Sequence, residues 1–298
     1  MTDLTDLFPG FASHWIDTEA GRIFARVSGE GPPLVLLHGF PQTHVMWHEV
    51  APALAGRFTT VVMDLRGYGW SSAPGSEDGA QYAKRKMGQD VITVMGKLGH
   101  VRFALVGHDR GGRVGYRLAL DHPGHVEKLA LLDILPTVRV WDNIRAGVTP
   151  AAHWGFLSRP APEPEEEIAK APDAFYEGLM AKWTRDQSLS CFDARAMGQY
   201  RAGWGDRSRT HAMCEDYRAG ATMDLEQDET DLRSGRKIQC PTLIATGDFY
   251  LTRAAQQPPV EVWRNTFAPQ AQGVVIDSGH FLAEENPQAT IDALMEFL

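Results

Sequence analysis

The chain has 298 residues, of which 43% are hydrophobic and 22% charged, the balance of an ordinary globular protein. This length suffices for one large domain or two smaller ones with a substantial core. The formal net charge of −9 argues against nucleic acid or an anionic membrane surface as a partner.

The first residues and the cysteines both favour a cytoplasmic location. The opening stretch MTDLTDLFP holds two acids and no long apolar core, which is unlike a secretory signal, and no stretch is long and apolar enough to span a membrane. The cysteines are odd in number and widely spaced, which is typical of free thiols in a reducing compartment. They are Cys191, Cys214 and Cys240.

Strand-like and helix-like stretches alternate over the first 135 residues. Segments 14–18 and 22–27 predict a hairpin. The continuous apolar run 33–37 is typical of a strand buried on both faces, and further strands are predicted at 59–63, 103–106 and 128–132. Helices are expected at about 46–54, 82–98 and 113–120. This alternation predicts an α/β protein with a doubly wound, mostly parallel sheet.

The pattern changes after residue 135. From 136 to 239 only helix-like segments are expected, such as 173–183 and 214–219. Strand-like runs return at 241–246 and 273–276, and a last helix begins near 286. We interpret 136–239 as a helical cap inserted after the sixth strand. The core domain would then consist of residues 1–135 and 240–298.

The stretch Gly107-His108-Asp109-Arg110-Gly111-Gly112 joins a predicted strand to a predicted helix. Small residues two before, two after and three after Asp109 allow a sharp turn and hold Asp109 in a strained conformation at its tip. The alternative is an ordinary glycine-rich turn that binds phosphate. We favour a nucleophile elbow because the rest of the chain supplies the partners of one.

Those partners follow in the chain order of an α/β-hydrolase triad. Asp133 and His280 each follow a predicted strand, so nucleophile, acid and histidine succeed one another as expected. Asp248 also follows a strand and is the alternative acid, although the Gly247-Asp248 turn leaves almost no loop for its carboxylate to reach back. Asp277 is close to His280 in sequence, but we expect it to be turned away.

The HGFP turn at residues 38–41 has two conceivable uses. The backbone N–H groups of Phe40 and Arg110 are expected to point at Asp109 and to form an oxyanion hole. The other use is a metal site, with His38, His44 and His48 as candidate ligands. No acid or cysteine cluster accompanies these histidines, so we predict no metal and no other cofactor.

An aspartate at the elbow changes the reaction. Its ordinary pKa of about 3.9 leaves it ionised at neutral pH without a base. A carboxylate transfers acyl groups poorly, but it can displace a leaving group from a saturated carbon and form an alkyl ester. His280 is then free to activate water against that ester. The substrate is therefore expected to carry a halide or an epoxide on an sp³ carbon.

Arg110 and Arg113 favour an anionic substrate. One adjoins the nucleophile and the other lies one helical turn further on, so both can reach the pocket. A guanidinium pair can clamp a carboxylate. It also removes the repulsion between substrate and Asp109, which reaches ~4 kcal/mol at a separation of ~4 Å and an effective dielectric constant of ~20. The alternative is that one or both arginines pair with structural acids.

Several strings carry a family resemblance: HGFPQTH, DLRGYGWSS, YAKRKM, GHDRGGRVGYR, HW followed by RPAPEPE, HAMCEDYRAG and DSGHFLAEENP. Together they resemble the haloacetate (fluoroacetate) dehalogenases of the α/β-hydrolase fold. The resemblance implies hydrolysis of a haloacetate to glycolate and halide, with Asp109 attacking, Asp133 as the acid and both arginines holding the carboxylate. It also implies a halide site, formed by His153, Trp154 and Tyr217. The spacing of these three residues is equally compatible with plain packing.

Two other functions stay open at this point. An epoxide hydrolase shares the aspartate and histidine, but needs proton donors, usually two cap tyrosines. The available tyrosines are Tyr176, Tyr200 and Tyr217. A non-catalytic α/β-hydrolase-like binding protein is the second alternative. The expected partners are a small anionic haloacid and water. The sequence does not establish a preference among fluoro-, chloro- and bromoacetate or larger 2-haloacids as substrates. It also leaves open whether the protein forms a homodimer.

Overall fold

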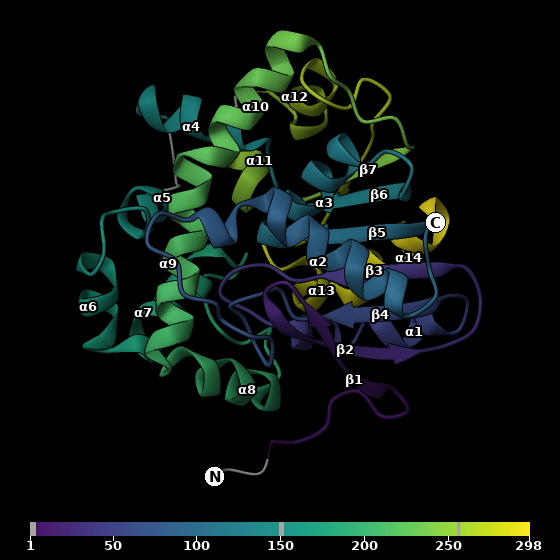
Figure 1. Cartoon of the computed structure of the whole chain (residues 1–298), viewed down its shortest axis with the longest axis horizontal. Coiled ribbons are helices and arrows are strands. Elements are labelled where there is room, and N and C mark those ends of the chain that lie inside the picture. Colours follow the sequence, from purple (N-terminus) through teal and green to yellow (C-terminus); the bar gives the residue numbers. More distant parts are fainter. Residues whose placement is uncertain (1–3, 149–151, 255–256) are drawn as a thin grey trace.

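One eight-stranded sheet organises the residues that the computed structural model describes, 4–148, 152–254 and 257–298. Its strand order is β1-β2-β4-β3-β5-β6-β7-β8. β1 pairs antiparallel with β2, and β2 with β4, whereas every other neighbouring pair is parallel. The predicted doubly wound, mostly parallel sheet is confirmed (Figure 1).

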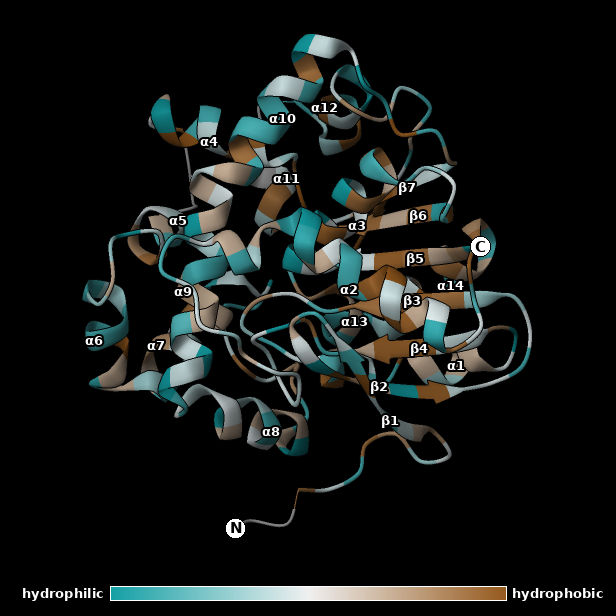
Figure 2. Ribbon diagram, in the orientation of Figure 1, coloured by the Kyte–Doolittle hydropathy of each residue, from teal (hydrophilic) through white to brown (hydrophobic). Residues whose placement is uncertain are grey.

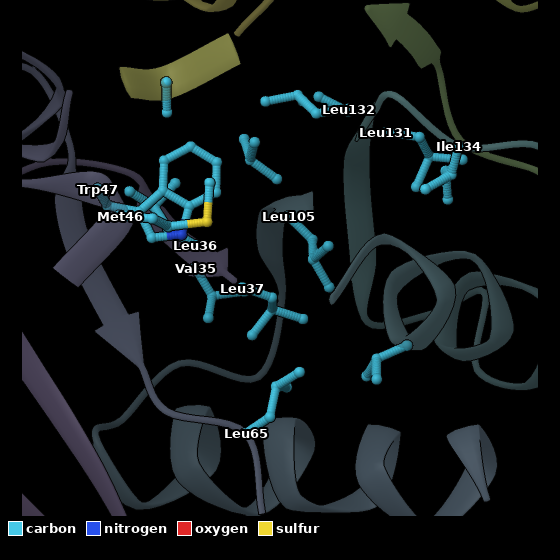
Figure 3. Packing of buried hydrophobic residues seen from close by; sticks show 14 of the residues in the cluster. Val35, Leu36, Leu37, Met46, Trp47, Leu65, Leu105, Leu131, Leu132 and Ile134 are labelled. Carbon is cyan, nitrogen blue, oxygen red and sulfur yellow. The ribbon is translucent and has the colours of Figure 1, made fainter. Parts of the chain in front are cut away.

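The strands follow the apolar runs closely. They are β1 (Ala12–Thr18), β2 (Gly21–Ser28), β3 (Pro33–Leu37), β4 (Thr59–Met63), β5 (Phe103–His108), β6 (Val126–Leu132), β7 (Thr242–Gly247) and β8 (Gln272–Ile276). Figure 2 shows the hydrophobic colour concentrated along the central strands. Figure 3 shows leucines of β3, β5 and β6 packing with Ile134, Met46 and Trp47. Residues 34–37 of β3 are fully buried, because helices cover both faces of a parallel sheet.

Helices connect the strands and cover the sheet. Those of the first 135 residues are η1 (His44–Trp47), α1 (Ala51–Ala55), η2 (Ala80–Tyr82), α2 (Lys84–Lys97) and α3 (Asp109–Asp121). Those after β7 are α11 (Tyr250–Ala254), α12 (Pro259–Asn265), α13 (Leu282–Glu285) and α14 (Pro287–Phe297). Within the described ranges, none of the helices combines the length and apolar character needed to cross a bilayer.

Seven helices lie between β6 and β7 in the described part of the chain. They are α4 (Thr137–Arg145), α5 (Ala152–Leu157), α6 (Glu163–Ala169), α7 (Pro172–Trp183), α8 (Ala194–Trp204), α9 (Arg207–Ala221) and α10 (Met223–Ser234). Figure 1 shows α5 to α9 gathered on one side of the sheet. The predicted helical insertion after the sixth strand is thus confirmed, and its exact limits as a domain stay a prediction. We refer to α4–α10 as the cap.

One predicted helix is wrong. The sequence suggested a single helix over about 46–54, but the chain forms the short η1, a turn, and then α1. Pro52 is the cause, because it stands in the first turn of α1. In a continuous helix its ring would clash with the carbonyl of residue 48, and its missing N–H would break the hydrogen-bond ladder.

Candidate active site

The glycine-rich turn has the geometry of an elbow. β5 ends at His108, and α3 begins at Asp109, whose φ of +40° lies in the left-handed region. A Cβ placed on Gly107 would lie 2.6 Å from the carbonyl oxygen of Gly111, and one on Gly112 would lie 2.8 Å from that of Gly107. Strand and helix therefore approach too closely for any side chain, which holds Asp109 in a strained position at the tip.

Asp109 is buried but well supported as an anion. Phe40 N–H donates to Asp109 Oδ2 at 3.1 Å, and Arg113 Nε lies 4.0 Å from Asp109 Oδ1. Burial alone would raise the pKa of Asp109, but the charges of His280, Arg110 and Arg113 outweigh it and lower the pKa below its ordinary value. Asp109 Oδ1 accepts no hydrogen bond from a described residue, so its lone pairs are free for attack.

His280 meets Asp133. His280 Nδ1 lies 2.7 Å from Asp133 Oδ2, and Gly247 N–H donates to Asp133 Oδ1 at 3.1 Å. Burial alone would lower the pKa of His280, but the Asp133 and Asp109 carboxylates outweigh it and raise the pKa above the ordinary value. The Asp133 contact leaves His280 Nε2 as the ring nitrogen available for proton transfer.

The other two carboxylates considered for this role lie elsewhere. Asp248 and Asp277 both form ion pairs with Arg185, and their side chains are 39% and 74% exposed. Neither hydrogen-bonds to His280, whereas Asp133 does. The geometry thus favours the predicted acid over its alternative, because Asp133, with a φ of +50°, turns back from the end of β6 toward the histidine.

Arg113 is anchored beside the nucleophile. Its Nη1 donates to Leu135 O at 3.0 Å and to Thr137 Oγ1 at 3.1 Å, and its guanidinium carbon lies 4.4 Å from the centre of the Trp154 ring. Its Nε is buried without a hydrogen-bond partner among the described residues. Such an unpaired buried donor is costly, and a bound anion would satisfy it.

Arg110 combines a structural ion pair with a free donor. Its Nη2 donates to Asp216 Oδ1 at 2.6 Å, and its Nε lies 3.2 Å from both carboxylate oxygens of Asp216. Its guanidinium carbon lies 4.3 Å from the centre of the Tyr217 ring. The remaining nitrogen, Nη1, is buried and without a partner in the described part of the chain. The predicted substrate contact and the alternative pairing with a structural acid are therefore compatible.

The three residues proposed for halide binding form one aromatic cluster. The Tyr217 ring lies 5.7 Å from that of His153, 5.5 Å from that of Trp154 and 5.2 Å from that of Phe40. Their polar atoms hydrogen-bond to no described residue. Burial lowers the pKa of His153 to about 3, so its ring is neutral at pH 7 and carries one N–H. The cluster thus offers three neutral donors next to Phe40, which contacts Asp109.

The three cap tyrosines available for an epoxide hydrolase have different surroundings. Tyr176 donates to Thr210 Oγ1 at 3.3 Å, and Tyr200 donates to Glu284 Oε1 at 2.8 Å. The rings of Tyr176 and Tyr217 both lie beside Phe40, with centres 5.7 and 5.2 Å away. Of the three hydroxyl groups, that of Tyr217 alone has no hydrogen-bond partner among the described residues.

The histidines of the HGFP region are engaged within the fold. His38 Nε2 accepts a hydrogen bond from Leu65 N–H at 3.0 Å, and His44 Nδ1 lies 3.0 Å from Asp64. Within residues 4–148, 152–254 and 257–298, no three His, Cys, Asp or Glu side chains are grouped as a metal would require. These contacts shape the loop that carries Phe40.

Sequence reasoning missed two aromatic residues that touch the site. Trp183 lies at the end of α7, with its ring 4.5 Å from that of His153 and 5.6 Å from that of His280. The Tyr250 ring lies 4.9 Å from the His280 ring. Neither belongs to a string that carried the family resemblance, so only the folded structure reveals that Trp183 of the cap and Tyr250 of the core both lie against His280.

A doubly wound sheet with an elbow residue, a capping insertion and a histidine after its last strand defines the class as an α/β hydrolase. The family model described as alpha/beta hydrolase fold matches residues 32–287, and the chain belongs to this family.

Relatives agree with this assignment. A fluoroacetate dehalogenase from Burkholderia sp is 44% identical over 98% of this chain and 95% of its own. A soluble epoxide hydrolase from Corynebacterium sp. (strain C12) is 29% identical over 93% of both chains. The solved structure of a Nostoc sp PCC 7120 protein assigned to the α/β hydrolases superposes with a TM-score of 0.91, at 44% identity, over 96% of this chain and 97% of that one.

Proposed function

We propose that this chain hydrolyses the carbon–halogen bond of haloacetates, giving glycolate and halide. One observation carries the proposal: two buried guanidinium groups, each with an unpaired nitrogen, flank an ionised elbow aspartate. Two cations beside one carboxylate suit a substrate with a carboxylate of its own. The 44% identity to a fluoroacetate dehalogenase supports the same conclusion.

The first half-reaction is a displacement. Asp109 Oδ1 attacks the substrate's saturated carbon, and the carbon–halogen bond breaks with its electron pair leaving on the halide. Arg110 Nη1 and Arg113 Nε hold the substrate carboxylate and fix the angle of attack. Asp109 Oδ2 becomes the carbonyl oxygen of the new ester, already within reach of Phe40 N–H.

The departing halide needs donors of its own. His153 N–H, Trp154 Nε1–H and Tyr217 O–H are the proposed ligands, since each is neutral, packed against aromatic rings and without another partner in the described chain. Neutral donors stabilise the negative charge that develops on the halogen as the bond breaks.

The second half-reaction is ester hydrolysis. His280 Nε2 takes a proton from water, whose oxygen attacks the carbonyl carbon of the Asp109 ester. The Phe40 N–H stabilises the tetrahedral oxyanion. Arg110 N–H is the proposed second donor, because first-turn N–H groups of a helix have no partner within that helix. Asp133 stabilises the imidazolium. As the intermediate collapses, the bond from the carbonyl carbon to the glycolate oxygen breaks and the imidazolium returns its proton to that oxygen. Asp109 then releases the remaining water proton to solvent and is again a carboxylate.

A halide-release assay over fluoro-, chloro- and bromoacetate tests the proposal, with an epoxide such as styrene oxide as the comparison. We expect turnover of the haloacetates and none of the epoxide, because Tyr176 and Tyr200 hydrogen-bond elsewhere. Diol formation without halide release would support the epoxide hydrolase instead. Absence of both reactions would support a binding protein.

A further inference from the structure

Two of the sequence strings have residues with no part in this reaction. YAKRKM covers residues 82–87, and HAMCEDYRAG covers 211–220. In the structure they meet at Arg110: Lys84 on α2 forms an ion pair with Asp216 on α9, and Asp216 forms another with Arg110 on α3. All three side chains are at most 1% exposed.

Asp216 fixes the guanidinium group of Arg110 in orientation. Besides its carboxylate contacts to Nε and Nη2, its backbone carbonyl accepts a second bond from Nη2 at 2.8 Å. Contacts to two nitrogens of a planar group allow one orientation only. That orientation leaves Nη1 as the nitrogen without a partner in the described chain.

Lys84 and Tyr68 hold the Asp216 carboxylate in place. Asp216 forms an ion pair with Lys84, a second buried cation, and accepts a hydrogen bond from Tyr68 Oη at 2.9 Å. Lys84 is in turn held by Asp224, whose carboxylate lies 3.6 Å from Nζ and accepts from the Lys84 backbone N–H at 2.8 Å.

We propose that Asp216 is a positioning residue that aims Arg110 Nη1 at the substrate carboxylate, and that Lys84 is a second positioning residue that holds the Asp216 carboxylate against Arg110. The inference rests on the proposed function, since it concerns how the same site holds its anion. Because α9 belongs to the cap and α2 and α3 to the core, Arg110 is aimed only while the cap is seated on the core.

The test is Asp216→Asn, which keeps the shape of the side chain but removes its charge. Losing a hydrogen bond to a charged group predicts an increase in KM for chloroacetate of roughly 10-fold to 100-fold. Chloroacetamide is neutral and has no carboxylate for Arg110 to hold. We therefore expect its kcat/KM to change less than about 3-fold. Halide release measured with Asp109→Ala is subtracted as the background. Lys84→Met shifts KM for chloroacetate in the same direction.

Asp231→Asn is the matched control. Asp231 forms a buried ion pair with Arg117, which also joins the cap helix α10 to α3. We expect this variant to lose thermal stability as Asp216→Asn does, but to keep the wild-type ratio of activities on the two substrates. An Asp216→Asn protein with an unchanged ratio, or an equal shift of the ratio in Asp231→Asn, would overturn the positioning role.

A crystal structure of Asp216→Asn separates this inference from the proposed function. We expect Arg110 to leave its wild-type orientation, and an unmoved guanidinium group would refute the inference whatever the enzyme's activity. If the unmodified chain releases no halide from any haloacetate, the proposed function fails instead. Even in that case, the position of Arg110 in the Asp216→Asn crystal structure shows whether Asp216 orients it.

Discussion

Replacing Arg113 separates its charge from its shape. Arg113 Nε lies 4.0 Å from Asp109 Oδ1. For a substrate carboxylate held by the same guanidinium group we take a separation of about 4 Å between the two charges. At this separation and an effective dielectric constant of ~20, one unit charge contributes about 4 kcal/mol. Arg113→Met should therefore lower kcat/KM for chloroacetate by roughly 10²-fold to 10³-fold.

Arg113→Lys keeps the charge but loses the planar fork, together with the anchors to Leu135 O and Thr137 Oγ1. We expect an intermediate loss of about 10-fold to 100-fold, because the carboxylate is attracted but no longer held at the angle of attack. Steady-state halide release from chloroacetate and chloroacetamide measures both variants. The neutral amide should be affected much less, and an equal loss on both substrates would refute the reasoning and make Arg113 a structural residue.

Three further predictions follow from the same geometry. His280→Asn should release one halide per active site and retain a carboxymethyl ester on the Asp109 peptide, detectable by mass spectrometry; continued turnover would contradict the assigned second step. Tyr217→Phe and Trp154→Phe should slow fluoroacetate by about 10-fold to 100-fold but bromoacetate by less than about 3-fold, because small fluoride gains most from converging donors; equal slowing would mean that the cluster only packs the cap. The base form of His280 is neutral and its pKa is raised, so kcat for bromoacetate should rise with pH through a limb above about 6.5. Asp133→Asn should move this limb to lower pH, and a wild-type limb below 6.5 would contradict the Asp133 pairing.

The sequence alone determined the order of strands along the chain and the ionisable residues that follow them. The predicted strands 33–37 and 59–63 match β3 and β4 residue for residue, since strands buried on both faces are rich in apolar and β-branched residues. The glycines around Asp109 likewise indicate the elbow, because only residues without side chains permit so close an approach of the β5 and α3 backbones. The same local logic failed over 46–54, where Pro52 outweighed the helical spacing.

Tertiary structure decided everything that depends on which distant residues meet. Asp133 and Asp248 both follow a strand, and only the folded chain shows that one contacts His280 while the other pairs with Arg185. The link from Lys84 through Asp216 to Arg110 joins residues more than a hundred positions apart. Periodicity and spacing report the local backbone, whereas ion pairs between the cap and the core depend on how the packed layers close on each other.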